Sequence, residues 1–152
     1  MLEGLFHAAL EDSNKREVNL SYQELERIAL QTPLPVDAEV ALGKTNRMRL
    51  IAEIKRASPS RGDLAPIDDA ADQGLGYQEA GADAISVLTE RTGFKGSLED
   101  LARVSQATTI PTLRKDFISN EYQLLEARAN GAAIALLILA GLTKADYLRL
   151  KG

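Results

Sequence analysis

The chain has 152 residues, of which 45% are hydrophobic and 26% are charged, and this composition is ordinary for a single globular domain. Its net charge of −4 argues against nucleic acid as a partner, and the absence of cysteine excludes disulfides, thiolate metal sites and cysteine nucleophiles. No apolar run approaches the ~20 residues of a membrane helix, and the first residues lack the features of a signal peptide, so we expect a cytoplasmic protein with no membrane partner.

The first fifty residues predict a helical extension. Residues 2–12 and 22–31 have helical patterns, and the second helix follows Ser21 and Glu24 at the spacing of a capping box. A proline-rich break then separates this helix from the first apolar run. We therefore expect residues 1–48 to extend the main domain rather than to form a separate one.

From residue 49 onward, short apolar runs alternate with helical segments. The runs are rich in Ile, Leu and Val and short enough for buried strands, and they cover residues 49–55, 84–89, 111–115 and 133–139. Helices are expected between them, at residues 67–80, 97–106 and 119–130, with one more beginning after Thr143. This alternation predicts parallel strands joined by right-handed crossovers.

Cap and turn residues support these helix boundaries. Ser97 and Asp100 resemble a capping box with Asp in place of the usual Glu, and Ser119 can cap the following helix. Gly81 and Gly131 supply C-terminal stops, because glycine readily adopts the left-handed conformation that ends many helices.

Four such strand-helix units make half of a known architecture. A (β/α)8 TIM barrel needs eight strands and about 250 residues. We therefore expect an α/β fold in which residues 49–152 form the N-terminal part of a (β/α)8 TIM barrel, about four βα units, after the helical extension. An open sheet of this kind leaves two edges unpaired, and such edges could support self-association.

Three charged residues mark a candidate active site. Alternation along the first strand places Glu53 and Lys55 on one face, and it places Lys115 on the same face of its own strand as Leu113. Charges at the carboxyl ends of barrel strands converge on the rim where catalysis usually occurs. Structural salt bridges are the alternative interpretation, because ion-pair networks also perturb ionisable groups.

Other polar groups have structural interpretations, or have both a structural and a functional one. The small, hydroxylated and basic loop at residues 57–62 suits an anionic ligand, but it is also compatible with an ordinary turn. His7, the only histidine, is expected on a surface helix. The acidic cluster at residues 68, 69 and 72 is interpreted as a helix N-terminus rather than a metal site, because carboxylates there complement the helix dipole.

The strands and loops named above resemble the indole-3-glycerol phosphate synthase family. The matching blocks follow the family's order and spacing over roughly residues 45–145. They are Ile51-Ala52-Glu53-Ile54-Lys55-Arg56-Ala57-Ser58-Pro59-Ser60-Arg61-Gly62, Ala84-Ile85-Ser86-Val87-Leu88-Thr89-Glu90, Phe94-Lys95-Gly96-Ser97, Leu113-Arg114-Lys115-Asp116-Phe117-Ile118, Tyr122-Gln123, Glu126-Ala127-Arg128 and Ala135-Leu136-Leu137-Ile138. The N-terminal helices also suit this family, which has an extension before its barrel.

The resemblance implies a carbon-carbon lyase of tryptophan biosynthesis. Such an enzyme closes, decarboxylates and dehydrates 1-(2-carboxyphenylamino)-1-deoxyribulose 5-phosphate, a small phosphorylated substrate, and no metal or organic cofactor is expected. Lys115 matches the family's general acid, Lys55 a lysine that contacts the anionic groups of the substrate, and Glu53 the carboxylate that orients both. Ser58 matches the ligand-binding loop. The apolar positions around the anthranilate ring are Pro59, Phe94, Leu113, Phe117 and Leu136.

The resemblance also implies that further site residues lie outside this chain. These are the glutamate general base, the asparagine and arginine that hold the carboxylate, and the loops that bind phosphate. We therefore expect the chain to be inactive by itself. The alternative is a non-catalytic half-barrel that serves as a binding or assembly module, in which two copies could regain eight strands.

Overall fold

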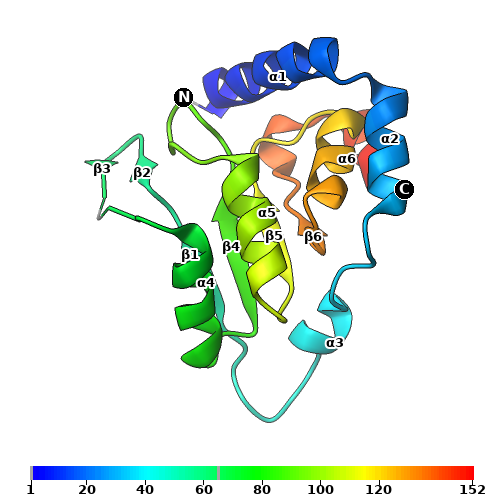
Figure 1. The fold of residues 1–152 in the computed structure, drawn as a ribbon. Helices are drawn as coiled ribbons and strands as arrows, with labels where there is room; N and C mark the ends of the chain where they lie inside the picture. The colour runs from blue at the N-terminus through cyan, green and yellow to red at the C-terminus, as the bar shows by residue number, and fades with distance from the viewer. Residues whose placement is uncertain (1, 65) are drawn as a thin grey trace.

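A four-stranded parallel sheet, ordered β1-β4-β5-β6, lies at the centre of the computed structural model, which describes residues 2–64 and 66–152 (Figure 1). The elements, in chain order, are α1 (Leu2–Asn19), α2 (Tyr22–Gln31), α3 (Ala38–Leu42), β1 (Ile51–Ile54), β2 (Ala57–Ser58), β3 (Gly62–Asp63), α4 (Ala70–Glu79), β4 (Ala84–Leu88), α5 (Leu98–Ala107), β5 (Thr112–Lys115), α6 (Glu121–Ala129), β6 (Ile134–Ala135), the 3-10 helix η1 (Leu139–Gly141) and α7 (Lys144–Leu150). This α/β arrangement is that of a partial TIM barrel, as predicted. Among the described helices, none is both long and apolar enough to cross a membrane.

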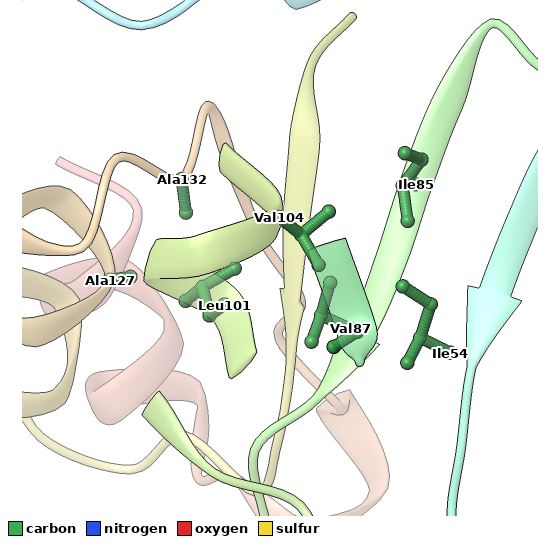
Figure 2. Packing of buried hydrophobic residues seen from close by; sticks show 8 residues of the cluster. Ile54, Ile85, Val87, Leu101, Val104, Ala127 and Ala132 are labelled. Carbon is green, nitrogen blue, oxygen red and sulfur yellow. The ribbon is translucent and has the colours of Figure 1, made fainter. Parts of the chain in front are cut away.

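One face of the sheet packs against the crossover helices. Ile85 and Val87 of β4 are fully buried, and they contact Leu101 and Val104 of α5 in the core that Figure 2 shows. Side chains alternate along a strand, so the intervening residues of β1, β4 and β5 point to the opposite face. That face carries the charged residues that mark the candidate site.

Helix caps follow the sequence closely, with one correction. The Ser21–Glu24 capping box is present, and Gly81 and Gly131 have the positive φ angles (95° and 82°) of C-terminal stops. The cap of α6 is Asn120 rather than Ser119, because the Asn120 side chain accepts the N–H of Gln123 while the Ser119 N–H donates to the Gln123 side chain.

The cap of α5 departs from a capping box for a reason outside the helix. The Ser97 hydroxyl accepts the N–H of Asp100, as expected. The Asp100 carboxylate does not return the bond, because it accepts two hydrogen bonds from Arg56 at 2.9 and 3.0 Å. This pairing raises the pKa of Arg56 and ties the segment after β1 to the start of α5.

The structure contains several elements that the sequence did not predict, and two predicted elements have different ends. The first helix continues to Asn19 instead of ending near residue 12, and α3 and the β2–β3 hairpin were not predicted. The last strand is only Ile134–Ala135, and η1 follows it. The hairpin depends on contacts with the distant residues Phe94 and Lys95, which the periodicity of apolar residues does not report.

Helix α1 is joined to α6 and β5 through a largely buried charge network. Arg16 of α1 donates to both oxygens of Glu126 on α6, at 2.5 and 3.0 Å. Glu126 also accepts from Arg114 of β5 at 3.1 Å, and Arg114 donates to Asp116 at 2.9 Å. Burial lowers the pKa of Arg16, but the hydrogen bond and charge of Glu126 outweigh that effect and raise it. The network therefore fixes α1 against the residues on either side of Lys115.

Candidate active site

Glu53 bridges two lysines at the carboxyl end of the sheet. Its side chain lies 2.6 Å from the Lys115 ammonium and 3.0 Å from the Lys55 ammonium. Lys115 ends β5 and Lys55 directly follows β1, with β4 between these two strands. The register pairs Glu53 with Ser86 and Leu88 with Lys115, so the three charged groups converge above the middle strand.

The two lysines hold Glu53 in its ionised form. Partial burial raises the pKa of Glu53, but hydrogen bonds from Lys115 and then Lys55, with their positive charges, lower it further than burial raises it. The net pKa is below the ordinary glutamate value. Two ammonium groups therefore face one carboxylate, which leaves positive charge available for an anionic ligand.

Acid is expected to destabilise the chain partly through Glu53. Because its pKa is lowered on folding, its interactions contribute stability that is complete above the ordinary value of 4.5 and is lost as pH falls through the lowered pKa. Urea unfolding at pH 7 and at about pH 3 should show a smaller loss of stability for Glu53→Gln than for the wild type. In a Lys55→Met/Lys115→Met variant only burial acts on the pKa of Glu53 and raises it, so the loss should be no larger than that of Glu53→Gln. If both variants lose as much stability between pH 7 and about pH 3 as the wild type does, Glu53 is not a source of the acid sensitivity.

Two connected features shape the space around these charges. A small pocket of about 70 Å³ is lined by Glu53, Lys55 and Lys115 together with Leu88, Phe117 and Ile138. A more open pocket of about 410 Å³ lies beside it, between Lys55, Phe94 and the β2–β3 hairpin that carries Ser58 and Pro59. Lys55 and Phe94 line both, so charged and apolar surfaces meet at this point.

Three aromatic rings form the apolar wall. The Phe94 and Phe117 ring centroids are 6.1 Å apart, and Phe6 of α1 meets Phe117 edge-on at 5.5 Å. Phe6 also lies against Gly141, where a Cβ atom would overlap its ring. Helix α1 thus packs across the end of the sheet that holds the site (Figure 1).

The structure brings most of the expected residues together and leaves two of them outside the pockets. Ser58, Pro59 and Phe94 line the open pocket, and Phe117 lines the small one. Leu113 and Leu136 are half-buried and line neither pocket. Leu113 lies two residues before Lys115 on the same face of β5, because every second residue of a strand shares a face. Leu136 lies two residues before Ile138 in the segment that follows β6, and both Lys115 and Ile138 line the small pocket.

Sequence reasoning missed the contributions of α1 and Ile138. Leu5 lines the open pocket and Phe6 supports Phe117. No local signal shows where an extension helix docks, so these two residues could not be assigned. Ile138 could have been found by continuing the alternation two residues past Leu136.

The remaining polar groups have structural positions. His7 is exposed on α1 beside Glu11, and Asp69 caps α4 by accepting the N–H of Ala71. Among the residues that the structure describes, no group of three His, Cys, Asp or Glu gathers to hold a metal ion.

Comparisons with known proteins all match one family. A family model described as indole-3-glycerol phosphate synthase matches residues 2–152. Three proteins named indole-3-glycerol phosphate synthase are similar to this chain: 48% identity in Leifsonia xyli subsp. xyli, 47% in Mycolicibacterium gilvum and 45% in Arthrobacter sp.. The matches cover 93%, 93% and 96% of this chain and 55%, 52% and 55% of those proteins. The chain spans about half the length of the curated relatives it matches.

Proposed function

Because this chain belongs to the indole-3-glycerol phosphate synthase family, we propose that it supplies the acid side of the active site of such a carbon-carbon lyase. The observation that carries the proposal is the Lys55–Glu53–Lys115 cluster, which lies beside an aromatic wall at the carboxyl ends of β1 and β5. The substrate would be 1-(2-carboxyphenylamino)-1-deoxyribulose 5-phosphate, and the location cytoplasmic, as for other biosynthetic enzymes.

Each member of the cluster suits one part of this chemistry. Ring closure and loss of water need proton donors next to developing charge, and the Lys115 ammonium at the pocket can protonate the substrate carbonyl oxygen. Lys55 lies between the two pockets and can contact the anionic groups of the substrate. Glu53 orients both lysines through its two short contacts.

The apolar wall suits the aromatic part of the substrate. Phe94 and Phe117 line the small pocket together with both lysines, and offset or tilted packing of an anthranilate ring against them is favourable. A ring held there would also exclude water and so strengthen the hydrogen bonds of the lysines. Ser58 and Arg61 on the hairpin offer further polar groups that line the open pocket.

We also propose that turnover needs residues from outside this chain. Its relatives are about twice as long, and the described sheet contains four of the eight strands of a barrel. In this proposal residues 1–48 are an extension and residues 49–152 are half of the barrel. Residues 1–152 joined to the complementary half of the Leifsonia xyli protein should form indole-3-glycerol phosphate, whereas the 152 residues alone should not. A folded but inactive chimaera would contradict the proposed activity.

An assembly module is the second candidate, favoured by the open edge of β1. Among the described residues β1 pairs only with β4, and Leu50 and Ile51 at this edge are 54% and 46% exposed. If two copies complete one barrel, light scattering should give twice the 16.5 kDa mass of the chain. Ile51→Lys should then restore the monomer, because a charged side chain discourages pairing at a strand edge. A folded wild-type monomer would exclude this candidate.

A further inference from the structure

Glu90 is a buried carboxylate that the proposed chemistry does not use. It lies just beyond β4, and only 3% of its surface is exposed. Its carboxylate accepts the backbone N–H groups of Thr92, Gly93 and Phe94 at 2.9, 2.7 and 3.0 Å. Among the described residues no lysine, arginine or histidine pairs with it, so backbone amides provide its charge stabilisation.

The loop that Glu90 holds is tightly folded. Gly96 donates its N–H to the Glu90 carbonyl at 2.8 Å, so both the side chain and the backbone of Glu90 bind the same short segment. Lys95 has a φ of 53°, in the left-handed region that costs energy for a residue with a side chain. A Cβ atom at Gly96 would overlap the Leu88 carbonyl. Such a conformation persists only where surrounding bonds enforce it.

The same loop holds the β2–β3 hairpin in place. The Phe94 carbonyl accepts the N–H of Ala57 at 3.1 Å, and the Lys95 ammonium pairs with Asp63 at 2.5 Å. Gly93 lies against the hairpin as well, since a Cβ atom there would come within 3.1 Å of the Pro59 ring. Residues 93–95 therefore contact both ends and the turn of the hairpin.

We propose that Glu90 is a positioning residue: by shaping residues 92–95, its carboxylate holds Phe94 and the β2–β3 hairpin around the substrate pocket. Hydrogen bonds to an ionised acceptor are stronger than neutral ones, which suits a group that fixes a strained loop. Glutamine at this position has one oxygen for three N–H donors, and its NH₂ group would face at least one of them. The ordering of the loop is independent of the proposed function, whereas its effect on substrate rests on that function.

Amide hydrogen exchange on the 152-residue chain tests the ordering. In Glu90→Gln the amides of Thr92, Gly93 and Phe94 should exchange about tenfold faster or more, because each loses a charged acceptor. The amides of Ile85 and Thr89, which bond across the sheet, should keep their wild-type rates. Glu99→Gln, an exposed glutamate on α5, is the matched control and should change none of them. Glu90→Asp keeps the charge on a shorter side chain and should give a smaller increase at the same three amides.

Two results would overturn the proposal. One is wild-type exchange of the three loop amides in Glu90→Gln, and the other is equal acceleration of loop and sheet amides in both Glu90 variants. In the active chimaera, Glu90→Gln should raise KM about tenfold and change kcat less than about threefold, because the pocket wall rather than the proton donor is disturbed. A fall in kcat at unchanged KM would contradict the role at the pocket. An inactive parent chimaera would count against the proposed function alone, since the exchange result does not require catalysis.

Discussion

Arg114→Met is expected to lower the free energy of unfolding by about 3–5 kcal/mol, because it leaves the buried Asp116 carboxylate without its cation and leaves Glu126 with Arg16 alone. Arg114 is fully buried, and its guanidinium donates to Asp116, Glu126, the Thr89 hydroxyl and the Gln123 carbonyl. Small domains have only about 5–15 kcal/mol of stability, so the variant should lose a large fraction of the stability of the wild type. Urea unfolding followed by circular dichroism measures the effect.

The control is an arginine whose ion pair is exposed. Arg103 donates to Asp69 at 2.5 Å, but its side chain is 48% exposed to solvent. Arg103→Met should cost at most about 1 kcal/mol, because exposed ion pairs gain little over hydrated charges. Equal losses of stability in the two variants would show that the buried network around Lys115 contributes no more than an exposed ion pair.

Lys115→Ala is expected to reduce kcat of the chimaera by about 10²–10⁴-fold, which is the usual contribution of a positioned proton donor. The Lys115 ammonium is the group at the small pocket that this mechanism uses to protonate the substrate carbonyl. Its side chain is 40% exposed, so its removal should leave the fold intact. A steady-state assay of indole-3-glycerol phosphate formation, with a circular dichroism spectrum of each variant, separates lost chemistry from lost folding.

Two further variants make the assignment of Lys115 specific. Lys144→Ala, at an exposed position on α7, should retain wild-type turnover. Glu53→Gln should reduce activity less than Lys115→Ala, because it leaves the acid present and removes only its orienting partner. Wild-type turnover in Lys115→Ala would refute the assignment of the acid, whatever the other two variants show.

The comparisons confirm the family resemblance, and the structure confirms the fold class that alternation predicted. Four apolar runs became four parallel strands, although the last is much shorter than its run. The convergence of Glu53, Lys55 and Lys115 also followed from the sequence. Parallel strands put their carboxyl ends at one edge, and alternation assigns each side chain to a face.

Long-range packing accounts for what the sequence did not reveal. Phe6 lies more than a hundred residues before Phe117, yet the two rings meet at 5.5 Å. The Asp100 carboxylate belongs to an apparent capping box but binds Arg56. Glu90 ends one of the matching blocks, but its local sequence does not show that its carboxylate binds the amides of residues 92–94. Such contacts depend on which elements approach one another, and the periodicity of apolar residues does not predict this.

The sequence alone thus determined the four strands of the parallel sheet and most of the helices, the face on which the charges lie and the family to which the chain belongs. These properties follow from local periodicity and from the order of motifs, and both are visible in the amino-acid sequence. The tertiary structure decided that Glu53 binds both lysines at once, that α1 completes the aromatic wall and that Glu90 holds the loop behind Phe94. Distances and hydrogen-bond partners arise only when segments far apart in the chain pack together, so they could be read only from the folded molecule.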